Sequence, residues 1–470
     1  MNKSIVSMLM AAVTGLQIAA VCAADIDRVI VRQQWPWSTD VRVEYELSGV
    51  DAAQPVDITV RAYNGETELV LPNSAIRGER FAITTGGVRE LFIDPVAAFG
   101  SASVSIPDFK VKLTTNNSPA DINEVLYKVF DLATSTHEDI TRADILNGKK
   151  GSFETDFLKI GGNVSREILV WTEVTNDIAY ATTKLVMRRI KGAGQTVTMG
   201  SPSDEVGRET DGRETQHNVT LANEDYFIGV FPLTIGQVAN SKYMYSKSGG
   251  SITLNSGTVI YTTATWNTAE GEEQDACPIP LTYPYQAMRG KPTADNGVYD
   301  WPTGTSVQNG TYMAMMNKWT GVDFNLPTEA QWEFACRGGT VTGLNNGQNL
   351  TSATGGGNVK SLAWTAENAN GTLHRVGQRL PNAYGLYDMH GSVLECCIDY
   401  YTADVSSLPT TDVGGPTSRP ATAASGHVRV LKGGGYKYAA NTVRSGWRRN
   451  WVENASITDQ LGVRLVCPAE

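Results

Sequence analysis

The sequence has 470 residues, which exceeds one typical domain and predicts about two to four of them. The formal net charge is −10, and charged residues make up 19% of the chain without a block of basic residues, which argues against nucleic acid as the main partner. Hydrophobic residues make up 41% of the chain, enough to bury substantial cores.

Residues 1–24 predict a secretory signal peptide. Lys3 supplies a short positive start, residues 5–21 are mostly apolar, and Ala23 and Ala24 offer small residues for cleavage. The alternative is a membrane anchor, but several polar residues interrupt the apolar run. No other stretch is long and apolar enough to span a bilayer. We therefore expect an exported protein, extracellular or periplasmic, without a membrane span after signal cleavage.

Residues 25–117 predict an immunoglobulin-like β-sandwich. Apolar and polar residues alternate with a period of two in residues 27–37, 41–47, 56–63 and 109–113, the pattern of short strands with one buried face. We find no catalytic constellation in this part of the chain.

Residues 118–186 predict a small β module or connector. Residues 124–132 and 167–172 are rich in β-branched and aromatic side chains and are expected to form strands. The segment that follows leads directly into the last part of the chain, residues 187–470.

The stretch from Pro381 to Tyr401 combines many aromatic and aliphatic side chains with three carboxylates, Asp388, Glu395 and Asp399. Its glycines and its lack of a 3.6-residue period predict a buried, irregular loop. The backbone groups of such a loop must be satisfied internally or by a bound ion.

Three further motifs accompany this stretch: VTMGS at 197–201, NLPTEAQWEFACRGG at 325–339 and RVLKGGG at 429–435. In this order the four motifs resemble the formylglycine-generating enzyme / sulfatase-modifying factor family, over roughly residues 185–470. The resemblance implies an α+β domain with a C-type-lectin-like fold, made of small sheets, short helices and much irregular backbone.

The active oxidases of that family bind copper with two cysteines that follow the closing glycines, and they convert a substrate cysteine to formylglycine. In this chain the corresponding positions are Tyr438 and Val443, or Ala440 when counted back from the next arginines. No cysteine lies between Cys397 and Cys467. Copper is therefore not expected, because Cu(I) requires soft ligands.

The remaining cysteines allow other interpretations. Cys396 and Cys397 are adjacent within the aromatic motif and are expected to be buried thiols or one half of a disulfide, with a redox pair as the alternative. The resemblance implies a disulfide between Cys336 and Cys467, with two buried thiols as the alternative. The sequence assigns no role to Cys277.

The resemblance also implies a structural calcium site. It places the side chains of Asp388 and Glu395 and the carbonyl groups of Gly391 and Val393 around one ion. Calcium prefers about six to eight oxygen ligands, and this spacing allows one bent loop to supply four of them.

The family's ligand surface is formed by loops near the C-terminus, and seven residues of this chain are candidates for it. They are Lys437, Tyr438, Asn441, Arg444, Trp447, Arg449 and Trp451. Aromatic and arginine side chains suit a binding surface. The alternative is core packing, in which Arg444 and the neighbouring Arg448 hold carboxylates inside the domain.

These observations favour an exported, non-oxidase member of the family that binds a protein, a peptide or a glycan. The alternative is a formylglycine-generating or related oxidoreductase that modifies sulfatase cysteines with a different pair of thiols.

Overall fold

A computed structural model describes residues 24–469, except for 35–36, 73–74, 102–104, 150–152, 161–162, 243, 249–250, 255–258, 262–267, 282–286, 291–292, 296–297, 301–306, 355–356, 413–427 and 453–459. The predicted signal peptide therefore lies outside the described residues, apart from Ala24. Within the described part, no helix is long and apolar enough to cross a membrane.

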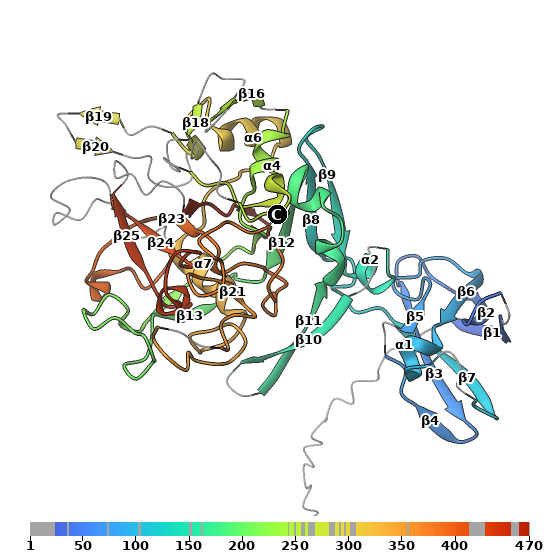
Figure 1. Ribbon diagram of the computed structural model, residues 1–470. Coiled ribbons are helices and arrows are strands. Elements are labelled where there is room, and N and C mark those ends of the chain that lie inside the picture. The colour runs from blue at the N-terminus through green and yellow to red at the C-terminus, as the bar shows by residue number, and fades with distance from the viewer. Residues whose placement is uncertain are drawn as a thin grey trace, which may run out of the picture. The chain divides into compact units, whose positions relative to one another are not determined.

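The chain forms two compact units, an N-terminal one that ends at Asn123 and also takes in Leu146–Gly148, and a larger one that comprises Glu124–Ile145 and Lys149–Glu470 (Figure 1). The fold is α+β, with many short strands and few helices, as the sequence predicts.

The N-terminal unit contains two antiparallel sheets that share one core. One sheet has the order β1-β2-β6-β5, formed by Asp25–Gln33, Val41–Ser48, Gly87–Ile93 and Ile76–Arg77. The other has the order β4-β3-β7, formed by Thr67–Leu69, Val56–Asn64 and Phe109–Asn117. Val43 and Leu91 of the first sheet and Ile58 of the second lie in the same hydrophobic cluster. This is the arrangement of the predicted β-sandwich.

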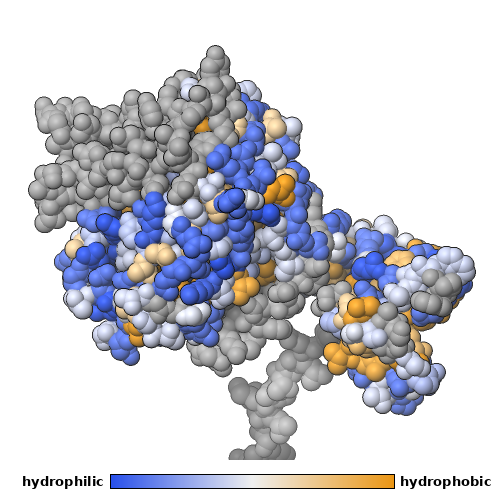
Figure 2. Space-filling model, in the orientation of Figure 1, coloured by the Kyte–Doolittle hydropathy of each residue, from blue (hydrophilic) through white to orange (hydrophobic). Residues whose placement is uncertain are grey.

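Alternation along these strands explains the fold of this unit. Val43, Tyr45 and Leu47 of β2 point into the core, whereas the residues between them reach the surface. The short helix α1, Pro95–Phe99, starts at Asp94, whose side chain accepts hydrogen bonds from Val96 N and Ala97 N. Apolar residues also reach the surface of this unit, where Figure 2 shows orange patches. They include Val70 and Val88.

The larger unit is built on a five-stranded antiparallel sheet of order β27-β15-β12-β8-β9. Its strands are Val466–Pro468, Tyr226–Gly229, Lys184–Ile190, Val125–Asp131 and Thr136–Thr141. The strands β8 and β9 belong to the region expected to form a small module. In this sheet β9 is an edge strand, and β8 lies next to it.

A second, four-stranded sheet has the order β25-β24-β23-β26, formed by Arg449–Val452, Val428–Lys432, Leu394–Tyr400 and Leu461–Gly462. The expectation of an irregular loop throughout Pro381–Tyr401 is wrong for its second half, which is the strand β23. Every residue of β23 is buried. A strand buried on both faces shows no alternation, so its pattern did not reveal it.

Two helices carry the second motif and its surroundings. Helix α6, Tyr312–Thr320, starts at Thr311 and ends at Gly321. Helix α7, Glu329–Arg337, starts with a capping box between Thr328 and Gln331 and ends at Gly338 in the left-handed conformation, with φ +54°.

The other described elements of the larger unit are mostly short, apart from the strands β10 and β11. Its other helices are α2 (Arg142–Leu146), α3 (Ala179–Thr182) and α4 (Ile235–Ala239), with 3₁₀ turns η2 (Thr172–Thr175), η3 (Gln274–Ala276), η4 (Val405–Ser407) and η5 (Ala440–Val443). Its other strands are β10 (Phe153–Ile160), β11 (Asn163–Trp171), β13 (Thr196–Met199), β14 (His217–Thr220), β16 (Met244–Ser248), β17 (Ser251–Leu254), β18 (Val259–Tyr261), β19 (Thr293–Asp295), β20 (Val298–Asp300), β21 (Ala363–Trp364) and β22 (His390–Gly391).

Candidate functional site

The closing glycines form a tight loop between β24 and η5. Gly433 and Gly434 have φ values of +86° and +68°. A Cβ atom on Gly434 would lie 2.8 Å from the carbonyl oxygen of Thr442, so only glycine fits there without displacing the backbone. Two hydrogen bonds attach this loop to the stretch from Pro381 to Tyr401. Gly391 N donates to Gly433 O (2.7 Å), and Tyr436 N donates to Ser392 O (2.9 Å).

The positions at which the resemblance places copper ligands carry no sulfur. Tyr438 is half-buried, and Ala440 and Val443 are fully buried in an apolar cluster. A phenol, a methyl and an isopropyl group offer no soft donor to Cu(I). The residues present therefore do not fit the copper centre of the oxidases.

Cys396 and Cys397 are neighbours on β23 that point to opposite sides of it. Cys396 packs in one hydrophobic cluster of the unit and Cys397 in another. Burial, with Asp399 and Glu329 nearby, raises the pKa of the Cys397 thiol well above its usual range. These positions suit packing, and they do not form a thiolate pair that could hold one metal ion or react in turn.

The described residues contain no disulfide between Cys336 and Cys467. The Cys336 thiol donates a weak hydrogen bond to Ser445 Oγ at 3.6 Å, and burial raises its pKa to about 12. Cys336 belongs to one hydrophobic cluster and Cys467 to the other. The structure therefore agrees with the alternative of buried thiols.

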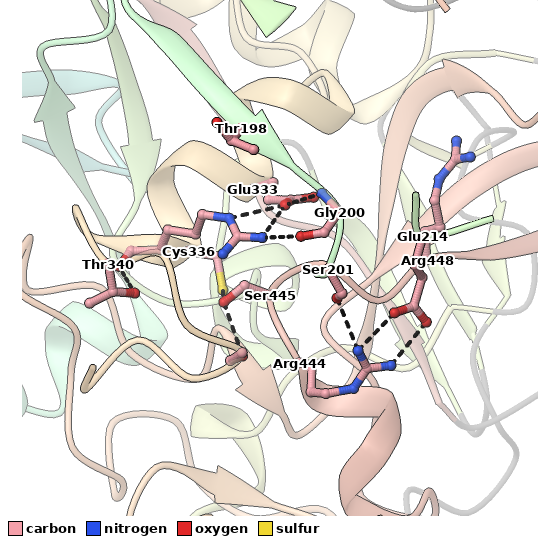
Figure 3. A network of polar contacts seen from close by, with 12 residues as sticks. Thr198, Gly200, Ser201, Glu214, Glu333, Cys336, Thr340, Arg444, Ser445 and Arg448 are labelled. Carbon is pink, nitrogen blue, oxygen red and sulfur yellow. Dashed lines mark hydrogen bonds and ion pairs between the residues drawn. The ribbon is translucent and has the colours of Figure 1, made fainter. Parts of the chain in front are cut away.

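Arg444 is fully buried, and its guanidinium faces Glu214 and Ser201 (Figure 3). Its Nη1 and Nη2 donate to the two oxygens of Glu214 at 2.7 and 2.9 Å, and Nη1 also donates to Glu205 at 2.8 Å and Ser201 at 3.0 Å. Glu214, Glu205 and Ser201 come from the first motif region. This confirms that Arg444 holds carboxylates inside the domain.

A second buried pair links the first motif to helix α7. Arg337 donates through Nε and Nη2 to Glu333 Oε1, and the same oxygen accepts from the backbone N–H of Gly200 at 2.9 Å. Lys432 donates to the other oxygen of Glu333 at 2.9 Å. Burial acts to raise the pKa of Glu333, but Lys432 and Arg337 together lower it below its usual value.

Arg448 forms a third buried ion pair. Together with the pairs of Arg444 and Arg337, it makes up what we call the framework of the domain. Its Nε and Nη2 donate to the two oxygens of Glu329 at 2.8 Å each, and Nη1 donates to the carbonyl oxygen of Thr402. The first, second and closing motifs therefore meet at buried ion pairs, through Gly200, Glu333 and Lys432. Such pairs fix the relative position of the loops, since breaking one leaves an uncompensated charge inside the unit.

The expected calcium ligands do not form a ready donor set. Both oxygens of Glu395 accept hydrogen bonds from Arg464, at 2.8 to 3.1 Å, and Oε2 also accepts from Trp332 Nε1. Asp388 Oδ2 accepts from Gly377 N at 2.7 Å, whereas Oδ1 is buried without a partner in the described structure. Burial raises the pKa of Asp388 to about 6.

With Glu395 paired to Arg464, the carbonyl groups of Gly391 and Val393 and the one unpaired oxygen of Asp388 fall short of what calcium requires. Calcium binding at this loop stays a prediction that a chelator experiment checks.

The candidate ligand residues divide into exposed and buried ones. Lys437 is exposed, and Tyr438, Asn441 and Arg449 are half-buried. Arg444 and Trp447 are buried, with 0% and 3% exposure, so they belong to the interior of the domain. Trp451 lies on β25, opposite Arg429 of β24.

The side chains of Tyr438 and Arg449 contact each other. Arg449 Nη1 donates to the Tyr438 hydroxyl at 3.1 Å, and the guanidinium lies 5.6 Å from the centre of the ring. The backbone of Tyr438 accepts a hydrogen bond from Ala366 N at 2.9 Å, which joins this pair to the loop that follows β21.

That loop region contains a stacked group that sequence reasoning missed. The Trp364 ring stacks on His374 at 3.6 Å with an interplanar angle of 6°, and the Arg379 guanidinium lies 3.4 Å from the centre of the same ring. At such short distances the two groups must cover opposite faces of the indole. No local pattern in the sequence links these three residues, which are brought together by loops.

The sequence-family model of the Sulfatase-modifying factor enzyme 1-like domain matches residues 182–469 of this chain. The formylglycine-generating enzyme of Streptomyces coelicolor is 35% identical over 129 residues, covering 25% of this chain and 37% of that enzyme. The mouse enzyme of the same name is 36% identical over 126 residues, covering 25% of this chain and 31% of that enzyme. The chain thus spans less than two fifths of the length of these relatives.

One solved structure, that of Treponema denticola variable protein 1, is 23% identical, with a TM-score of 0.41. The match covers 61% of this chain and 96% of that one.

Proposed function

Because the chain belongs to the Sulfatase-modifying factor enzyme 1-like family, we propose that it is an exported member that binds a ligand or another protein and lacks the family's oxidase chemistry. One observation carries this proposal. The loop that follows the three glycines contains no thiol, and Ala440 and Val443 in it are buried in an apolar cluster.

The rest of the domain keeps the framework around that loop. Arg444, Arg448 and Arg337 each hold a buried carboxylate, so the glycine loop is fixed in place although the copper ligands are missing. A rigid loop on a paired framework suits recognition, because little conformational entropy is lost when a ligand binds.

The proposed ligand surface consists of Lys437, Tyr438, Asn441 and Arg449. Arg449 contacts Tyr438, and Lys437 precedes Tyr438 in the chain, so the two cations and the tyrosine favour a ligand that carries an anionic group, whether protein, peptide or glycan. The Trp364 ring does not serve as a platform for a sugar, since both of its faces are covered. The oxidoreductase alternative needs a second thiol pair, and the positions of Cys396 and Cys397 in separate clusters speak against one.

The test is an affinity pull-down from the extracellular or periplasmic fraction of the native cells. Three baits are compared: the mature wild type, a double variant with Lys437→Ala and Arg449→Ala, and a Lys360→Ala control. Lys360 is an exposed lysine of the same unit outside the proposed surface. We expect a ligand that the wild type and the control retain and the double variant loses. A ligand that all three proteins retain equally would exclude this surface.

A further inference from the structure

Arg188 is a buried cation on the strand β12, which lies in the centre of the five-stranded sheet. Only 4% of the residue is exposed. Its direct neighbours across the sheet are Tyr127 on β8 and Ile228 on β15. The guanidinium carbon lies 4.7 Å from the centre of the Tyr127 ring.

The guanidinium of Arg188 has no ionic partner in the described structure. Its Nε and Nη1 atoms are buried without a hydrogen-bond acceptor. Three other buried arginines, Arg444, Arg448 and Arg464, each hold a carboxylate at 2.7 to 2.8 Å. The next residue, Arg189, pairs with Asp225 at 3.1 Å.

An unpaired guanidinium is costly at this position. Arginine cannot lose its proton in a protein, so the charge cannot be removed by titration. Burying an ion costs more free energy than a cation–π contact returns. Such an unsatisfied buried group calls for a bound ion or another specific explanation.

The surroundings of Tyr127 supply a further donor. The Tyr127 hydroxyl accepts a hydrogen bond from Trp171 N at 3.0 Å, which leaves its own proton to donate. The turn at Gly385 packs closely on this group, since a Cβ atom there would lie 3.2 Å from the Tyr127 oxygen and 2.9 Å from Val170 Cγ1. The space beside the hydroxyl is therefore small.

We propose that Arg188 and Tyr127 hold a small monovalent anion of the halide class inside the larger unit. The buried N–H groups of Arg188 donate hydrogen bonds to the anion. The hydroxyl group of Tyr127, whose ring lies under the guanidinium, donates another. An anion with one charge neutralises the guanidinium, and the close packing excludes a large one. This site does not depend on the proposed ligand surface, which lies on other loops.

The experiment measures chloride binding to the full mature chain by the linewidth of the chloride-35 NMR signal, with bromide as competitor. We expect excess linewidth in the wild type that bromide abolishes. Arg188→Met, which keeps the length of the side chain without its charge, should lose this excess. Arg189→Met should retain it, because Arg189 already has carboxylate partners.

A second variant and a second readout keep the test decisive if Arg188→Met does not fold. Tyr127→Phe should bind chloride roughly 10- to 100-fold more weakly, the usual value of a hydrogen bond to an ion. The melting temperature of the wild type should rise when chloride replaces gluconate at constant ionic strength. Excess linewidth that is absent from the wild type, or unchanged in both Arg188→Met and Tyr127→Phe, would overturn the proposal.

Discussion

Replacing Arg444 with methionine should strongly destabilise the larger unit. The substitution keeps an unbranched side chain but removes the donors to Glu214, Glu205 and Ser201. Arg444 and both carboxylates have side chains with at most 1% exposure. The variant therefore leaves two carboxylates inside the unit without a cation.

Breaking a buried pair by removing one partner costs about 3–5 kcal/mol, and we expect a loss of that size in the free energy of unfolding. The matched control is Arg213→Met in the same unit. Arg213 pairs with Asp211 at the surface, where the side chains are 28% and 46% exposed. A surface pair of this kind contributes at most about 1 kcal/mol.

Urea unfolding of the three proteins measures the difference, provided that the dependence on urea concentration has the same slope in each. A loss in Arg444→Met that is no larger than the loss in Arg213→Met would refute the reasoning. It would mean that the carboxylates are protonated or hydrated in the folded unit, so that Arg444 does not compensate buried charge.

Three further predictions follow from buried groups. Burial raises the pKa of Asp388 to about 6 and lowers that of His390 to about 4, so their effects on stability oppose each other. Asp388 adds stability that is complete below about pH 4 and is lost as the pH rises through 6, whereas His390 adds stability that is complete above about pH 6.5 and is lost as the pH falls through 4. Between pH 7 and pH 4, the free energy of unfolding of Asp388→Asn should fall by about 3 kcal/mol more than that of the wild type, and that of His390→Gln by about 3 kcal/mol less. Urea unfolding at several pH values measures this difference. Variant profiles that run parallel to the wild-type profile would contradict the prediction. If calcium binds at the Asp388 loop, a chelator should lower the melting temperature of the wild type and leave that of Asp388→Ala unchanged; an unchanged melting temperature in both would exclude the site. The Cys336 thiol should react with iodoacetamide only after unfolding, without prior reduction, as mass spectrometry of its peptide can show; a thiol that reacts only after reduction would instead indicate a disulfide.

The sequence predicted the architecture where local patterns are strong. Alternation in residues 41–47 and 56–63 marked strands β2 and β3 of the sandwich, because one face of each is buried. The same rule failed for β23, whose residues are all buried and show no period. It also gave no hint that β8 and β9 join a sheet whose other strands lie as far away as Val466–Pro468.

The framework could be predicted by residue type but not by partner. Arg444 and Arg448 were expected to hold carboxylates, yet Glu214 lies 230 residues from Arg444 and Glu329 lies 119 residues from Arg448. Only the folded chain shows which acid meets which base. The same holds for Glu395, an expected calcium ligand that pairs with Arg464 instead, and for Arg188, whose lack of a partner has no signature in the sequence.

The most direct test of the central proposal is mass spectrometry of a sulfatase-type peptide after incubation with copper-loaded mature protein. The readout is loss of the cysteine thiol and gain of the formylglycine aldehyde, with and without added copper. We expect no conversion, because residues 436–443 contain no thiol to hold Cu(I). Conversion that disappears in a Cys396→Ser, Cys397→Ser variant would contradict the account and establish an oxidase with a different pair of thiols.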